Sequence, residues 1–92
     1  MNLGVRNNIP FNGTIVVNDQ SIVKSDNPDT INARHYDANK IEYIEEFDDN
    51  NTQIIYSNNY GHYIDEVKTP VTKVLEAYNA TKGDNDLYVK LN

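Results

Sequence analysis

The sequence predicts an α+β fold: a small, mainly antiparallel β-sheet of about five to six short strands with one C-terminal amphipathic helix. Isoleucine outnumbers leucine nine to four, and β-branched side chains fit a pleated sheet better than a helix. The stretch 41–80 also carries the pattern of two turn-linked strands and a third, followed by a capped amphipathic helix. Both observations favour strands with one helix over a helical bundle.

A chain of 92 residues makes a single small domain. Because such a chain buries only roughly 60–65 % of its unfolded surface, we expect a thin core. No cysteine is present, so neither disulfides nor a thiolate metal site can reinforce that core. Domains of this kind often gain stability by oligomerising or by docking on a partner.

We expect residues 1–12 to form an N-terminal arm and residues 13–92 to form the domain. The arm is polar and aperiodic and contains the breaker Pro10. Its apolar residues are therefore expected to lie on a partner or a neighbouring subunit. They are Leu3, Val5, Ile9 and Phe11.

The first half of the domain predicts a hairpin. Asn12-Gly13 is a favourable turn dipeptide, and two short β-branched runs follow at 14–17 and 21–24. Residues 25–30 are nearly all turn formers and predict a loop. Residues 31–36 alternate in the manner of an edge strand.

The second half predicts a meander. A strand at 41–47 changes phase near Ile44-Glu45, which indicates a bulge. Residues 52–57 predict a central strand, because both of its faces carry isoleucine. Residues 58–61 form a tight connection with positive φ at Gly61 or Asn59, and 62–67 is the return strand.

A helix follows the meander. Thr69 is expected as its N-cap and Pro70 as its first residue. Gly83 is expected to stop the helix, and alternation over 86–91 predicts a final strand. The predicted apolar stripe consists of Val71, Val74, Leu75 and Tyr78.

No pattern of reactive or metal-binding residues stands out, so we expect a protein that is not an enzyme and holds no cofactor or metal. His35 and His62 lie far apart with no ligand spacing around them. Neither acidic cluster, at 45–49 or at 84–86, supplies the full ligand set of a calcium loop, and we interpret both as solvated turns. The alternative is a weak cation site or an electrostatic patch for a basic partner. No small-molecule substrate is expected.

The net charge and the hydropathy of the sequence limit the kinds of partner that the protein can have. A net charge of −6 and eight scattered basic residues argue against nucleic acid. No apolar run reaches membrane-spanning length, and the first residues lack the apolar core of a signal peptide. Tyrosine is enriched at protein interfaces, so four of the seven tyrosines are expected to contribute partner contacts: Tyr36, Tyr60, Tyr63 and Tyr88.

The overall composition, rich in Asn, Ile, Asp and Tyr and free of Cys and Trp, resembles that of small proteins encoded by AT-rich tailed bacteriophages, including crAss-like phages. Residues 58–64 are also similar to an Asn-Gly-x-x-Tyr-like hairpin of FlbD-type flagellar proteins. The chain departs from that pattern because it lacks the adjacent Asn-Gly and has about forty additional residues in front. Neither resemblance assigns a role to any residue.

These observations predict a non-enzymatic structural accessory protein of a larger assembly, such as an auxiliary capsid protein of a phage, whose partners are protein subunits. The expected location is the virion capsid, or otherwise the cytoplasm. The alternative is a small acidic inhibitor that presents carboxylates to a basic, nucleic-acid-binding host protein. Its candidate residues are Glu42, Glu45, Glu46, Asp48 and Asp49.

Overall fold

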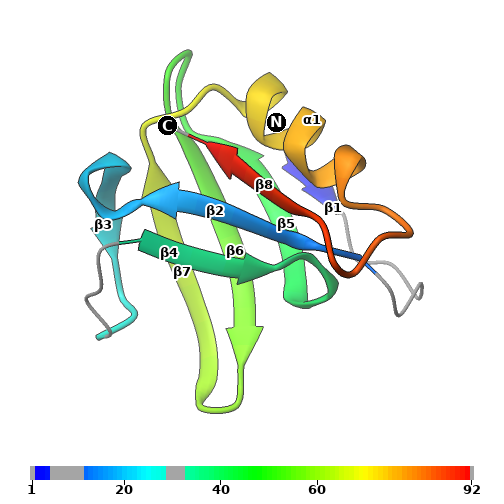
Figure 1. Ribbon diagram of the computed structural model, residues 1–92. Helices are drawn as coiled ribbons and strands as arrows, with labels where there is room; N and C mark the ends of the chain where they lie inside the picture. Colours follow the sequence, from blue (N-terminus) through cyan, green and yellow to red (C-terminus); the bar gives the residue numbers. More distant parts are fainter. Residues whose placement is uncertain (1, 5–11, 29–32, 92) are drawn as a thin grey trace.

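The computed structural model describes residues 2–4, 12–28 and 33–91, which form eight strands, one α-helix and two short 3₁₀ helices (Figure 1). The α+β class and the single helix are confirmed, but the strands outnumber the five to six expected. The strands are β1 (Asn2–Gly4), β2 (Thr14–Asn18), β3 (Ile22–Ser25), β4 (Ala33–Asp37), β5 (Ile41–Glu46), β6 (Thr52–Asn58), β7 (Gly61–Val67) and β8 (Tyr88–Leu91). The helix α1 spans Val71–Ala80, and the 3₁₀ helices η1 and η2 span Asp19–Ser21 and Ala38–Lys40.

The strands form two sheets rather than one. The larger sheet has the order β1-β5-β6-β7-β3 and is antiparallel throughout, with β6 in the middle as predicted. The smaller sheet has the order β4-β2-β8, in which β2 is antiparallel to β4 and parallel to β8. Figure 1 shows the strands of the smaller sheet crossing in front of those of the larger sheet.

The chain passes from one sheet to the other at two corners. β2 leads through η1 into β3, and β4 leads through η2 into β5. A side-chain oxygen holds the start of each corner: Asn18 Oδ1 accepts the N–H of Gln20 at 2.8 Å, and Asp37 Oδ1 accepts the N–H of Asn39 at 2.9 Å. Such corners are typical of sheets that pack across one another.

The predicted hairpin over 14–24 is therefore wrong. Asn18 stabilises a corner instead of a reversal, so β2 and β3 belong to different sheets. The predicted bulge exists but lies earlier, because the register of β5 on β6 shifts between Ile41 and Tyr43. Positive φ at Gly61 is confirmed, with a value of 154°.

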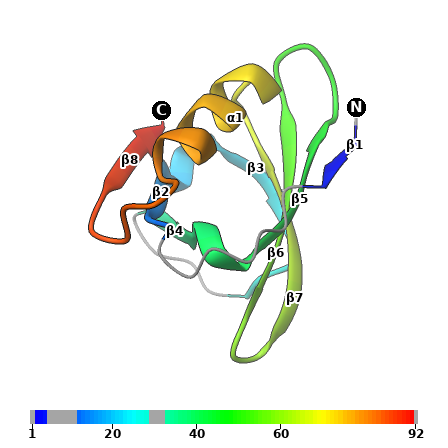
Figure 2. The same ribbon diagram turned by 90° about the vertical axis from the view of Figure 1, so that its right-hand side faces the viewer.

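The helix α1 closes the open side between the sheets. It packs against β8 and β5, and Figure 2 shows it lying between them. The predicted stripe is confirmed, because Val71, Val74 and Tyr78 are buried and Leu75 packs against the core. The final strand is also confirmed as β8, so the helix precedes the last strand instead of ending the chain.

Both predicted helix boundaries shift. Pro70, not Thr69, occupies the N-cap position, and it makes no side-chain cap hydrogen bond. Thr69 is buried, and its carbonyl accepts the Thr52 hydroxyl at 2.6 Å. At the other end Thr81 is the C-cap residue, and its hydroxyl donates to the Tyr78 carbonyl at 2.7 Å.

The core fills the space between the two sheets and α1. Burying each large aliphatic side chain contributes roughly 1.5–3 kcal/mol before the entropy cost. The buried hydrophobic residues come from both sheets and the helix, so the two sheets and α1 cover one another's apolar faces. They are Ile15, Val17, Tyr36, Ala38, Ile41, Ile44, Ile54, Tyr56, Val67, Val71, Val74, Ala77 and Tyr78.

Gly13 lies where three parts of the chain meet. Its N–H donates to the Thr81 carbonyl at 2.9 Å, and its carbonyl accepts the Ala38 N–H at 3.0 Å. Its φ is not positive, so a left-handed turn is not the reason for glycine. Space is the reason, because an added Cβ would lie 2.7 Å from the Asp84 carbonyl oxygen and even closer to that of Leu87.

We expect Gly13→Ala to lower the free energy of unfolding by about 1–3 kcal/mol, because the colliding atoms are backbone oxygens that cannot rotate away. Urea unfolding at neutral pH measures this loss. Asn79→Ala on the exposed face of α1 is the control, with an expected change within about 0.5 kcal/mol. An unchanged midpoint for Gly13→Ala would show that the close approach is not needed.

Candidate functional site

A carboxylate lies fully buried between the two sheets. Asp65 belongs to the inner face of β7 and is 0 % exposed. Removing a charged group from water costs several kcal/mol unless it is paired and hydrogen-bonded. The residues around Asp65 therefore decide whether this part of the fold is stable.

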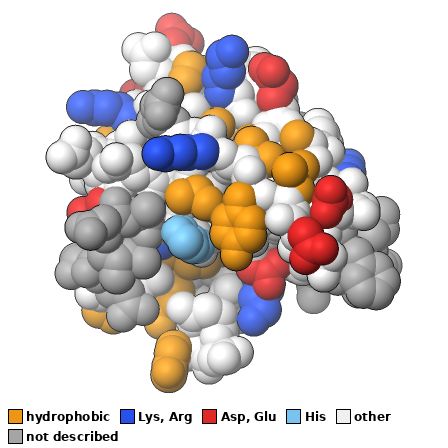
Figure 3. All heavy atoms as spheres, viewed as in Figure 1, with side chains coloured by type: hydrophobic (Ala, Val, Ile, Leu, Met, Phe, Trp, Pro, Cys, Tyr) orange, Lys and Arg blue, Asp and Glu red, His pale blue; other side chains and the backbone are white. Residues whose placement is uncertain are grey.

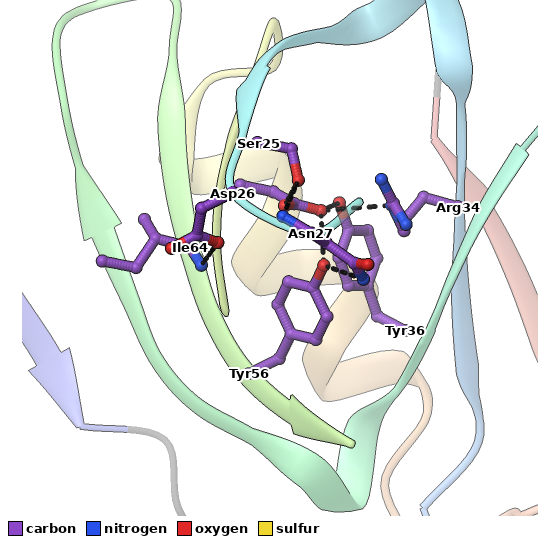
Figure 4. Close-up of polar contacts among 8 residues, drawn as sticks. Ser25, Asp26, Asn27, Arg34, Tyr36, Tyr56 and Ile64 are labelled. Carbon is purple, nitrogen blue, oxygen red and sulfur yellow. Dashed lines mark hydrogen bonds and ion pairs between the residues drawn. The ribbon is translucent and has the colours of Figure 1, made fainter. Parts of the chain in front are cut away.

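Four side chains from three other strands converge on the Asp65 carboxylate. Figure 4 labels them as Ser25, Arg34, Tyr36 and Tyr56. The hydroxyls of Tyr36 and Tyr56 donate to Oδ2 at 2.7 Å and 3.0 Å, and the Ser25 hydroxyl donates to Oδ1. Arg34 Nε lies 3.3 Å from Oδ2. Arg34 and Tyr36 come from the smaller sheet, so the contacts join the two sheets.

The Arg34–Asp65 pair is held by charge. Arg34 Nε is buried and has no hydrogen-bond partner among the described residues, although it lies within ion-pair distance of the carboxylate. Both side chains are almost fully removed from solvent, with 8 % and 0 % of their surface exposed. Screening by salt is weak at such a site.

Asn27 completes the arrangement. Its side-chain amide donates to the Tyr56 hydroxyl at 2.9 Å, and its backbone N–H donates to the Ser25 hydroxyl at 3.0 Å. The hydroxyls of Tyr56 and Ser25 thus each accept one hydrogen bond while donating another to Asp65. We call Ser25, Asn27, Arg34, Tyr36, Tyr56 and Asp65 the polar network.

The network changes the acidity of its two tyrosines. Burial, with the neighbouring Asp65 charge, raises the pKa of Tyr36 far above its usual value. Burial also raises the pKa of Tyr56 to about 12, against a partly opposing hydrogen bond from Asn27. Both hydroxyls therefore keep their protons and serve as donors at neutral pH.

A cleft of about 260 Å³ opens beside the network. Asp65 does not line the cleft and is fully buried, so the carboxylate is out of reach of a solute there. The hydroxyls of Ser25, Tyr36 and Tyr56 all donate to Asp65, so the polar network serves to hold the two sheets together. The cleft is lined by Asn27, Arg34, His35, Asp37, Lys40, Tyr56, Ser57 and Asn58.

Two searches of the described residues bear on other classes of site. Within residues 2–4, 12–28 and 33–91, no group of three or more His, Cys, Asp or Glu side chains could hold a metal ion. The one described α-helix, of ten residues, is not long and apolar enough to cross a membrane.

The four tyrosines predicted to bind a partner divide into two groups. Tyr36 is 1 % exposed and bonds to Asp65, so its side chain is not available to a partner and the prediction is corrected for this residue. Tyr60 at the β6–β7 turn and Tyr88 on β8 are 87 % and 62 % exposed. Tyr63 is partly buried against the core, and it lines a groove with Tyr60.

The arm residues have different positions. Leu3 lies on β1, which pairs with β5 of the same chain so that Leu3 is opposite Ile44. This pairing ties the start of the predicted arm to the chain's own larger sheet. Val5, Ile9 and Phe11 lie outside the described residues, and their contacts with a partner stay predictions.

The outer face of the larger sheet carries an apolar row that sequence reasoning missed. Tyr43, Ile55 and Ile64 are direct neighbours across β5, β6 and β7. Tyr43 is 47 % exposed and Ile64 45 % exposed, while Ile55 is partly exposed. The bulge between Ile41 and Tyr43 turns the Tyr43 side chain away from the core. Glu45 lies on the same face of β5, and a charged residue there was the sequence signal that this face is exposed.

The outer face of the smaller sheet carries a second exposed group. Val16 on β2 is the Cα partner of His35 on β4 and of Lys90 on β8. The rings of His35 and Tyr88 meet edge to face, with centroids 6.2 Å apart. Figure 3 shows hydrophobic side chains gathered beside a histidine on this side of the molecule.

Comparison with known proteins leaves the family open: the chain matches no family model, no curated protein and no solved structure. The geometry of the two outer faces and of the polar network is therefore the basis for assigning a function.

We expect Asp65→Asn to lower the free energy of unfolding by about 3–5 kcal/mol, because it leaves the Arg34 charge buried without its partner. Adding Arg34→Met should recover part of that loss, since the unpaired charge is then gone. Urea unfolding of the wild type, both single variants and the double variant measures the coupling. If the losses in unfolding free energy of the two single variants simply add in the double variant, Arg34 and Asp65 do not stabilise the fold as a pair.

We expect stability to fall as the pH rises from about 10 towards 12. The pKa of Tyr56 is about 12 in the folded chain against 10.0 for the free side chain, and that of Tyr36 is raised further. The folded state therefore holds protons that the unfolded state releases, so the stabilisation is complete below pH 10 and is lost above it. Urea midpoints between pH 8 and 11.5 measure the decline, which Tyr56→Phe should make shallower.

Proposed function

We propose that the chain is a structural accessory protein of a larger protein assembly, of the kind that an auxiliary capsid protein represents on a phage virion. The observation that carries the proposal is the exposure of large apolar side chains on both outer faces. Contiguous patches of this kind mark interaction sites in small proteins. On the outer faces these are Tyr43 and Ile64 of the larger sheet and Tyr88 of the smaller sheet, each 45–62 % exposed. Val23 on β3, Phe47 after β5 and Tyr60 at the β6–β7 turn add further exposed apolar surface.

The mechanism is adhesion. The two sheets and α1 form a rigid body because the polar network and the core fix their positions. A rigid body offers its exposed faces without a large entropy cost on binding. Acidic turns such as 48–51 face solvent at the edge of these faces, and Asp48 Oδ1 there accepts the N–H groups of Asn50 and Asn51.

The compositional similarity to small proteins of AT-rich tailed phages supports the virion as the location. Composition alone carries that step. The adhesive function does not depend on it, since the exposed faces are features of the fold.

A small acidic inhibitor is the second candidate. Glu42, Glu45 and Glu46 lie on β5, and Asp48 and Asp49 lie in the following turn, so the five carboxylates occur along one strand and its end. Two of them already have local contacts: Glu42 Oε1 lies 2.9 Å from His62 Nδ1, and Asp48 caps its turn. Glu42 and Glu45 are partly buried, whereas Glu46, Asp48 and Asp49 are exposed, so the inhibitor would act chiefly through the last three carboxylates.

We expect the chain to co-sediment with large particles from its native source in a density gradient. Purified chain should also rebind particles from which it has been stripped, because apolar contacts re-form without a cofactor. A chain that stays at the top of the gradient while the particles lack it would refute the assembly function. Rebinding that fades steeply from low to high salt, on a basic target, would favour the inhibitor.

A further inference from the structure

We infer that the outer face of the larger sheet is a docking surface for a partner protein segment that places an apolar side chain next to an arginine or lysine. The inference rests on the proposed function, because it names the surface and the chemistry of the partner. Figure 2 shows this sheet nearly edge-on, with α1 and the smaller sheet packed on its other side.

The apolar row supplies the contact area. Tyr43, Ile55 and Ile64 lie side by side on three adjacent strands, with Ile55 opposite both of the others in the strand register. The strands beneath them are the best paired of the fold, because β6 bonds to both neighbours along its length. The row is therefore a fixed strip, and a partner that covers it loses little conformational freedom of this chain.

Acidic side chains flank the row on both sides. Glu45 and Glu66 stand in the neighbouring row on either side of Gln53, and Glu42 lies on the opposite side beside His62. Among the described residues of these rows, Lys24 stands at the β3 end next to Glu66, and His62 contacts Glu42. Since His62 already contacts Glu42, the acidic character of the rim is greatest at the β3 end, where Asp26 and Glu66 lie with Lys24; this favours a basic partner and speeds its encounter.

A hollow of about 280 Å³ lies at the β3 end of the row. Ile64 contributes an apolar wall, while Asp26 and Glu66 contribute carboxylates. Asp26 is held in place because its Oδ1 accepts the Ile64 N–H at 2.8 Å (Figure 4), and Glu66 Oε2 accepts from the Asn51 amide at 3.0 Å.

This combination suits a long basic side chain. Arginine and lysine bury their aliphatic stems against apolar surface and keep the charged head among carboxylates. In the hollow the stem would lie on Ile64 and the head between Asp26 and Glu66. Lys24 also lines the hollow, so the two carboxylates face one resident ammonium group and leave room for one more positive charge.

A second copy of this chain fits the surface less well. Two copies packed face to face through the row would bring glutamates of both rims together, and like charges across an interface cost several kcal/mol. The net charge of −6 also opposes self-association, because two copies repel each other. The rim therefore selects a basic partner over a copy of itself.

The test is selection from a random peptide library displayed on phage, with the full immobilised chain as bait. We expect enriched peptides to contain an apolar residue beside arginine or lysine. A synthetic peptide of the enriched sequence is then titrated by calorimetry. Ile64→Thr and Glu66→Gln should each weaken its binding about tenfold, and binding should weaken with salt because the rim is charged.

Tyr88→Ser on the outer face of the smaller sheet is the matched control and should leave the peptide affinity unchanged. Thermal unfolding of each variant checks that it is folded, which we expect because Ile64 and Glu66 lie on the solvent face. Library selection that enriches nothing, enriches acidic peptides, or enriches peptides insensitive to Ile64→Thr would overturn the inference.

Two further outcomes separate this inference from the proposed function. A dimer in sedimentation experiments that Ile64→Thr dissociates would assign the surface to a second copy and overturn the basic partner. Particle binding that survives Ile64→Thr and Glu66→Gln but is lost on Tyr88→Ser would leave the assembly function intact and move the docking surface to the smaller sheet.

Discussion

The buried Asp65 carboxylate is the constraint on which the arrangement of the two sheets depends. It receives hydroxyl groups from Tyr36 on the smaller sheet and from Tyr56 on the larger sheet, and it neutralises Arg34. A purely apolar contact could be satisfied by many offsets of one sheet on the other. A fully buried charge cannot, because each offset that separates it from its donors costs several kcal/mol. The network therefore fixes how the sheets meet, and the surfaces on their outer sides follow from that.

Local patterns predict the parts of the fold that local forces decide. The apolar spacing of Val71, Val74 and Tyr78 is enough to locate α1, and isoleucine on both faces of 52–57 is enough to place β6 in the middle of its sheet. These segments bury a face whatever their distant neighbours are. The amphipathic period alone therefore carries the information.

The remainder depends on residues far apart in the sequence. The run 18–21 has the composition of a hairpin turn, but it forms a corner because β2 finds its partners in β4 and β8. Arg34 and Tyr36 have the polarity of surface residues and are buried because Asp65 meets them from another strand. A local sequence pattern does not show which distant residues come into contact. The polar network was therefore not predicted, and Tyr36 was expected to be exposed although it is buried.

The parallel pairing of β2 with β8 has a consequence for how the molecule forms. Thr14 aligns with Tyr88 and Val17 with Leu91, so β2 lies in the middle of its sheet only once the chain has been synthesised as far as β8. Until then one backbone edge of β2 has no protein partner, which is the condition under which strands recruit foreign chains. Closing a loop of that size also makes this the slowest kind of contact to establish. β8, which lies far along the sequence from β2, is thus the strand that shields β2 from unwanted association.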